Sequence, residues 1–274
     1  MCDRAAAQVI ASYSTSFSLA SRILPPTTRR DINNLYAMAR VADEIVDGTA
    51  LEAGADPATL IADYERAVLA APAARFHTDP VLHAYAASAR RCGFTEEHVR
   101  AFFASMRRDI RQVRYTREDF DEYVYGSAEV IGLLCLSAFL VGEDPAPANR
   151  ARMEAGARAL GSAFQKINFL RDFGEDRDTL GRRYLPEGMA PDDATKAAVT
   201  AGIREELAEA RAAIPLLPAP VRGAVAAAEA LFRELTTMLE QTDAADLAAA
   251  RVSVPASRKI MITARAAVTK GALP

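Results

Sequence analysis

The chain has 274 residues, half of them hydrophobic and a quarter charged, which is the composition of an ordinary globular protein with a sizeable core. Its net charge of -3 at pH 7 disfavours a protein that binds nucleic acid through a basic surface. The cysteines are scattered and indicate neither a disulfide framework nor a zinc site, so a reducing cytoplasm is the simplest compartment.

The first half of the chain is predicted to consist of helices separated by short breaks. Residues 1–14 contain an acid, a base and no long apolar core, so we expect no signal peptide there. One helix is expected to follow the break at residues 24–28 and to end near Gly48. Another is expected to begin where Asp56 can cap the residues that follow Pro57.

The second half of the chain is predicted to be helical as well. The apolar run at residues 130–142 is too short to span a bilayer and is expected to be a buried helix. A long helix is expected from about Met153 to Glu175, before a loop rich in Gly and Pro at residues 178–193. Since no strand pattern and no long linker occur, residues 1–274 are predicted to form one all-α domain.

Residues 39–48, ARVADEIVDG, place two acids four positions apart on the first long helix. One face of that helix is expected to carry Tyr36, Arg40, Asp43 and Asp47, while apolar residues point elsewhere. Two carboxylates at this spacing repel each other by roughly a few tenths of a kcal/mol. Because a single pair of this kind is usually part of a solvated face, the motif alone does not predict a site.

A second acidic motif, NFLRDFGED, occurs at residues 168–176. A narrow stripe of the predicted helix holds two amides and two acids, Gln165, Asn168, Asp172 and Asp176. The neighbouring residues are apolar, so this helix is not simply solvated, and an unpaired buried carboxylate is costly. Two such motifs, each with an arginine beside it, are much less expected by chance than one.

A divalent metal ion would make these carboxylate clusters tolerable. Hard oxygen ligands without histidine suit magnesium, which is usually held by a few carboxylates together with substrate phosphates. Arg40 and Arg171, which lie in the motifs, can bind phosphate oxygens through their guanidinium groups. The residues therefore favour a site for a diphosphate and magnesium ions between two helices.

Both motifs resemble those of a known family. Residues 36–48 (YAMARVADEIVDG) and 168–186 (NFLRDFGEDRDTLGRRYLP) are similar to the two aspartate-rich motifs of the squalene/phytoene synthase family. Residues 15–25, 123–132 and 251–259 resemble its N-terminal, central and C-terminal segments. The order and spacing of these motifs hold across nearly the whole chain.

The resemblance implies an all-helical isoprenoid synthase fold with helices around a central cavity. Family members join two prenyl diphosphates head to head through a cyclopropyl diphosphate intermediate. The DEIVDG form is similar to that of phytoene synthases, which implies two molecules of geranylgeranyl diphosphate as substrates and a role in carotenoid biosynthesis. The implied cofactor is Mg²⁺ or Mn²⁺, without a nicotinamide. A lipophilic product would allow peripheral contact with the inner face of the cell membrane.

The resemblance also implies roles for individual residues. The expected metal ligands are Asp43, Asp47, Asp172 and Asp176. The expected substrate-binding residues are Ser16, Arg40, Gln165, Asn168, Arg171 and Arg251. The tyrosines that match family residues near the reacting centre are Tyr36, Tyr123 and Tyr184. Each tyrosine is equally well interpreted as a core residue whose hydroxyl is hydrogen-bonded.

Some residues depart from the family pattern. Glu44 stands where the second acid of the first motif is usually aspartate, and Phe232 stands where many members have a tyrosine. Three alternatives remain open. The enzyme could instead use farnesyl diphosphate, as squalene-, dehydrosqualene- or presqualene-type synthases do, or cyclise a single prenyl diphosphate. A non-catalytic family member is the third, although intact aspartates in both motifs argue against it.

Overall fold

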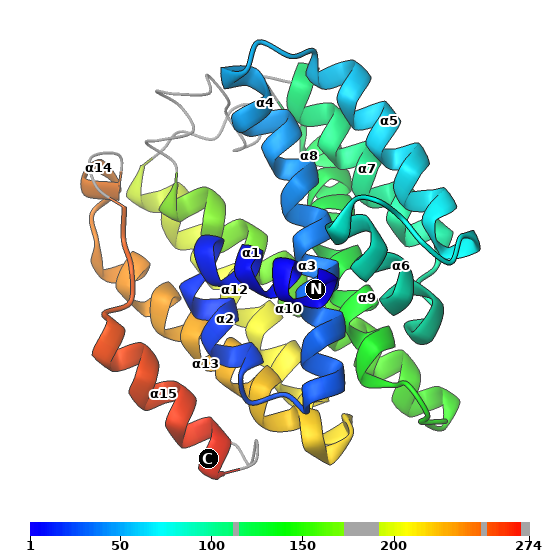
Figure 1. Cartoon of the computed structure of the whole chain (residues 1–274). Helices are drawn as coiled ribbons and strands as arrows, with labels where there is room; N and C mark the ends of the chain where they lie inside the picture. The colour runs from blue at the N-terminus through cyan, green and yellow to red at the C-terminus, as the bar shows by residue number, and fades with distance from the viewer. Residues whose placement is uncertain (112–114, 173–191, 248–250, 270–274) are drawn as a thin grey trace.

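The structure is a computed structural model, and it describes residues 1–111, 115–172, 192–247 and 251–269. Throughout these ranges the regular structure is helical, with no residue in a strand, which confirms the predicted all-α class. In Figure 1 the helices α5, α6 and α7 lie on one side of the molecule, and α12, α13 and α15 lie on the other. Helix α3 packs against the first group and α10 against the second.

The bounds of the helices confirm several features expected from the sequence. α3 ends at Asp47, immediately before Gly48, as predicted. The Asp56 carboxylate caps the next long helix by accepting hydrogen bonds from the amides of Ala58 and Thr59, both at 3.2 Å. The helices of the first half are α1 (Cys2–Tyr13), α2 (Thr15–Ser21), α3 (Pro26–Asp47), α4 (Thr49–Glu52), α5 (Pro57–Ala70), α6 (Pro80–Cys92) and α7 (Glu96–Arg111).

The second half contains the apolar helix and the longest one. The apolar run forms α9, which ends before Leu140, and its buried side chains confirm the predicted core helix. A π-helical turn over Tyr125–Glu129 joins α8 to α9. The helices of this half are α8 (Arg117–Val124), α9 (Val130–Phe139), α10 (Pro147–Arg171), α12 (Asp193–Ala213), α13 (Ala219–Gln241), α14 (Ala244–Leu247) and α15 (Ala256–Val268).

The limits predicted for the long helix were wrong at both ends. α10 already begins at Pro147, because a proline at the first helical position needs no amide partner and has a suitable φ. It ends at Arg171, and Asp172, with φ −99° and ψ 9°, follows as the C-terminal cap. The second acidic motif therefore begins on a helix but does not continue as one through Asp172.

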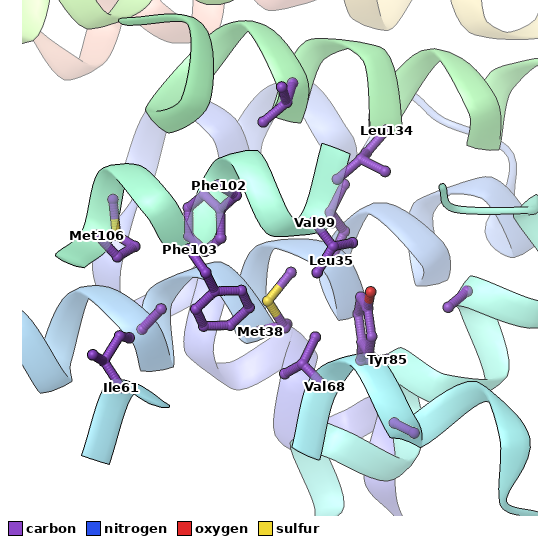
Figure 2. Packing of buried hydrophobic residues seen from close by; sticks show 14 of the residues in the cluster. Leu35, Met38, Ile61, Val68, Tyr85, Val99, Phe102, Phe103, Met106 and Leu134 are labelled. Carbon is purple, nitrogen blue, oxygen red and sulfur yellow. The ribbon is translucent and has the colours of Figure 1, made fainter. Parts of the chain in front are cut away.

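The two helices that carry the acidic motifs bury their apolar faces in different clusters. Leu35 and Met38 of α3 pack with Phe102 and Phe103 of α7 and with Leu134 of α9 (Figure 2). Ile167 and Leu170 of α10 pack with residues of α12 and α13, namely Ile203, Leu207, Leu235 and Leu239. Because each helix is fixed by its apolar side, its polar residues are held in a defined direction.

The π-helical turn in the central motif depends on a close approach between two helices. A Cβ atom at Gly126 would lie 2.5 Å from the carbonyl oxygen of Ala101 on α7, so only glycine fits there. The turn interrupts the regular helix just after Tyr123 and Val124, both of which are buried. Turns of this type occur frequently at functional sites.

Candidate diphosphate and metal site

The side chain of Arg40 is held by three groups around the first motif. Its guanidinium donates a hydrogen bond to the Glu44 carboxylate, and its Nη1 lies 3.6 Å from Oδ2 of Asp43. The guanidinium carbon lies 4.2 Å from the centre of the Tyr13 ring, which is a cation–π contact. Among the described residues, the buried Nε of Arg40 has no hydrogen-bond acceptor. An anion such as a diphosphate would supply one.

Asp43 is an acid of this face with a strongly shifted pKa. Burial, together with the negative charges of Asp47 and Glu44, raises the pKa of its carboxyl group to about 7 against the opposing effect of Arg40. Yet 40% of the side chain is accessible to solvent. The carboxylate is thus desolvated by its surroundings but reachable from solvent, and a bound cation would favour its ionised form.

Glu44 has a different role from the aspartates beside it. Burial raises the pKa of its carboxyl group, but hydrogen bonds from Thr49 and Arg40 outweigh this effect and lower the pKa to about 2. Both the amide and the hydroxyl of Thr49 donate to it, the amide at 3.1 Å. Glu44 is therefore already neutralised by protein groups and orients Arg40, which explains why this position tolerates glutamate.

Tyr36 lies on the same face, one turn before Arg40. Burial raises the pKa of its phenol to about 12, and neighbouring charges and a hydrogen bond with Ser14 modify the shift. The hydroxyl is consequently a neutral hydrogen-bond donor at physiological pH. Its ring lies 6.4 Å from that of Phe17 on α2, so the first motif adjoins an aromatic wall.

The second motif brings an acid and two arginines together at the end of α10. Nε of Arg171 donates to Oδ1 of Asp172 at 2.8 Å, and Nε of Arg251 lies 2.9 Å from the same oxygen. Gln165 and Asn168 are half-buried on the preceding turns of the helix. The contact between Arg251 and Asp172 joins two segments far apart in the sequence that were predicted to meet at one site.

Lys259 is a further cation that the analysis of the sequence did not single out. Its Nζ donates a hydrogen bond to the Thr15 hydroxyl at 2.8 Å. Burial lowers its pKa, and the positive charges of Arg171 and Arg251 lower it further, so the three cations lie close together. Its position within the C-terminal basic segment was the available signal. Among the described residues, three cations thus lie around Asp172, which is an arrangement suited to an anion.

Residues 13–15, between α1 and α2, connect the two charged clusters. Tyr13 stacks on Arg40, and the side chain of Ser14 lies beside the Tyr36 hydroxyl. The next residue, Thr15, accepts a hydrogen bond from Lys259. The acidic face of α3 and the cationic cluster at the end of α10 therefore lie on either side of this junction.

The remaining predicted site residues are placed less directly. Tyr123 is buried, and its hydroxyl donates to Oδ2 of Asp109 at 2.8 Å, which is the arrangement expected of a core tyrosine. Ser16 is half-buried on α2, and Asp47 is exposed at the end of α3. Asp176 and Tyr184 lie outside the described residues.

An aromatic cluster lies beside Tyr36. The rings of Phe164 on α10 and Phe232 on α13 are stacked with centroids 3.7 Å apart. The ring of Phe17 lies 5.4 Å from Phe164 and 5.6 Å from Phe232. Phe232, the residue that departs from the family pattern, is thus packed within an apolar wall together with two other aromatic rings.

Within the described ranges no three histidine, cysteine or acidic side chains are arranged to hold a metal ion by themselves. This agrees with magnesium, which commonly takes one or two carboxylates and completes its shell with water and substrate phosphates. The donors present are hard oxygen atoms, and the pKa of Asp43 is raised by burial although Arg40 lies beside it. The residues therefore fit a magnesium ion that arrives with a diphosphate.

Comparisons with known proteins agree with this geometry. The sequence pattern of the squalene/phytoene synthase family matches residues 10–258. A 15-cis-phytoene synthase from Paracoccus sp. is 33% identical over 65% of this chain and 58% of its own length. A phytoene synthase from Pseudescherichia vulneris is 30% identical over 84% of this chain and 80% of its own. The solved structure of a dehydrosqualene synthase in complex with ligand has a TM-score of 0.78 at 24% identity, covering 97% of this chain and 95% of that one.

The chain therefore belongs to the squalene/phytoene synthase family. The structural likeness confirms the predicted isoprenoid synthase fold. The chain spans somewhat more than half the length of the Paracoccus relative and four-fifths of the Pseudescherichia relative. Members of this family use prenyl diphosphates. These substrates combine an anionic diphosphate with an apolar chain, and the candidate site contains both charged and aromatic side chains.

Proposed function

We propose that the chain is a phytoene synthase, which condenses two molecules of geranylgeranyl diphosphate head to head to phytoene. Family membership and the relatives that carry this name support the proposal. The observation that carries it is the junction at residues 13–15, which contacts both the acidic face of α3 and the cationic cluster of α10. A diphosphate with its metal ion requires both kinds of group side by side.

The reaction begins when the C1–O bond of one substrate breaks and diphosphate leaves. Arg171, Arg251 and Lys259 stabilise the negative charge that develops on the leaving group. A magnesium ion held by Asp43, Asp47, Asn168 and Asp172, with Asp176, would supply Lewis acidity toward the diphosphate oxygens. Arg40, oriented by Glu44 and Tyr13, offers its unpaired Nε–H to a diphosphate oxygen.

The rest of the reaction takes place on the hydrocarbon chains. The double bond of the second substrate attacks the allylic cation, and loss of a proton closes the cyclopropane ring. Departure of the second diphosphate, rearrangement and loss of another proton then give the product. The clustered rings of Phe17, Phe164 and Phe232 provide an apolar wall that excludes water and has π faces suited to a cation.

A product assay tests this proposal. Purified protein receives geranylgeranyl diphosphate or farnesyl diphosphate with Mg²⁺, with and without NADPH, and the extracts are analysed by mass spectrometry. Phytoene from the first substrate without NADPH is the expected product. A C30 hydrocarbon formed only from farnesyl diphosphate would keep the mechanism and overturn the substrate assignment. A cyclic product from one diphosphate would overturn head-to-head condensation.

A further inference from the structure

The last helix, α15, has one face on the protein and one face exposed. It lies at the edge of the molecule along α13 and beside α2 (Figure 1). Thr263 and Ala266 are buried on the inner face, and Lys259 reaches Thr15 from that side. Because these residues hold the inner face against the protein, the opposite face of α15 points to solvent. This outer face does not belong to the site described above.

The exposed face of α15 is unusually apolar. The side chains of Ile260, Met261 and Val268 are 61%, 51% and 82% exposed. Elsewhere in the described ranges, no helix exposes three large hydrophobic residues. On an ideal helix the exposed apolar residues share a stripe about 120° wide, which consists of Ile260, Met261, Ala264, Ala267 and Val268.

Positive charge borders this stripe. Arg258 and Arg265 are exposed and lie along one edge of it, and α15 has no acidic residue. Arg258 pairs with Glu234 of α13, so Arg265 is the arginine of this edge that carries the argument. The sequence of residues 247–274 contains five lysines and arginines and no acid, although the whole chain has a net charge of -3. The basic residues of the chain are thus concentrated beside its most exposed apolar side chains.

We propose that this outer face of α15 docks the protein on the surface of a bilayer that contains anionic lipids. An apolar helix stripe can enter the boundary between headgroups and acyl chains, while arginines beside it extend to the phosphates. The charge pattern favours a bilayer over a second copy of the chain. A second copy would bring another α15, which carries basic residues and no acid, to the same surface.

Docking through α15 would also orient the candidate site toward the membrane. Lys259 of the cationic cluster directly precedes Ile260 and Met261 of the exposed stripe. A substrate with a long apolar chain could therefore pass between the bilayer and the site over a short path. The docking itself does not depend on which prenyl diphosphate the enzyme uses.

Flotation of the full-length protein with vesicles tests the proposal without any substrate. One set of vesicles contains phosphatidylcholine with about a third phosphatidylglycerol, and the other contains phosphatidylcholine alone. The protein is expected to bind the anionic vesicles, and added salt is expected to weaken the binding. The double variant Ile260→Gln/Met261→Gln is expected to lose about tenfold in vesicle affinity.

A matched control removes exposed apolar side chains from other surfaces. Phe76→Gln/Val141→Gln changes one loop and the end of the apolar segment, and vesicle binding is expected to be unchanged. Circular dichroism shows whether each variant is folded, and turnover in detergent is expected to stay at the wild-type level. Arg265→Gln, compared with Arg265→Lys, is expected to weaken binding to anionic vesicles only.

Three outcomes would overturn the proposal. The wild-type protein might be absent from the floating fraction with either vesicle. The Ile260→Gln/Met261→Gln variant and the Phe76→Gln/Val141→Gln variant could bind equally well, which would place docking on another surface. Finally, concentration-dependent dimerisation that the first variant abolishes would show that a second copy covers the face. Each result is independent of the product assay.

Discussion

The two acidic motifs look alike in the sequence but have opposite electrostatic surroundings in the structure. On α3, Asp43 is desolvated beside other acids, and its pKa is raised to about 7. At the end of α10, Asp172 is paired with both Arg171 and Arg251. Arg40 is the cation beside Asp43, and it also pairs with Glu44, whereas Arg171, Arg251 and Lys259 all lie around Asp172. The comparison teaches that motifs with the same spacing can leave one acid desolvated beside other acids and the other acid paired with several cations.

The largest expected effect comes from removing Asp43, the acid whose pKa is raised by burial and by its acidic neighbours. We expect Asp43→Asn to lower turnover by about a thousandfold, because a metal that stabilises the leaving diphosphate would lose a charged ligand. Steady-state assays over a range of Mg²⁺ concentrations measure the change. Wild-type turnover in this variant would contradict the metal assignment. Glu44→Gln is a control on the same helix, and it should lower turnover much less.

Removal of a cation from the second region should have a smaller effect. Lys259→Met keeps most of the side chain's length but removes the charge beside Arg171 and Arg251, so we expect turnover to fall by about 10- to 100-fold. Arg258→Gln, one residue earlier, is the control, since Arg258 pairs with Glu234 on the outside of the molecule. Equal effects of the two substitutions would show that Lys259 is not part of the anion site.

The comparison also predicts how stability depends on pH. The folded-state pKa of Asp43, about 7, is above the ordinary value of 3.8, so the folded protein binds this proton more tightly than the unfolded chain does. The stability of the metal-free protein should therefore fall as the pH rises from about 4 to 7. Because the side chain is 40% exposed, we allow only about 1 to 2 kcal/mol for this effect.

Asp43→Asn should accordingly be more stable than the wild type at pH 8 and should approach it near pH 4. Urea unfolding without metal at the two pH values measures the difference. A substitution that abolishes turnover while it stabilises the fold is typical of a functional site. Equal or lower stability of the variant at pH 8 would mean that Asp43 is not under electrostatic strain.

The face of α3 could be predicted from the sequence because all its residues lie within one helix. A period of 3.6 residues places Tyr36, Arg40 and Asp43 together without any knowledge of the fold. The site at the end of α10 could be predicted only in part. The pairing of Arg251 with Asp172, and the approach of Lys259, depend on the packing of α15 against α13.

Other errors have local physical causes. The start of α10 was placed near Met153 and not at Pro147, although a proline is well accommodated in the first turn of a helix. The length of α10 toward Glu175 was overestimated because helical spacing of the acids does not itself require a helix. The role of Tyr123 could not be decided from the sequence, since its partner Asp109 is on another helix.

The smallest expected effect concerns Tyr123 and separates a reacting group from a structural one. Tyr123→Phe removes the hydrogen bond to Asp109 but keeps the ring against Tyr115 and Phe169. If the tyrosine is a core residue, the free energy of unfolding should fall by about 1 to 2 kcal/mol and kcat should stay within about twofold. A fall in kcat without a loss of stability would instead assign the hydroxyl to the reaction. Tyr36→Phe is the informative comparison, because the Tyr36 hydroxyl lies on the acidic face of α3 and its loss should affect turnover more than stability.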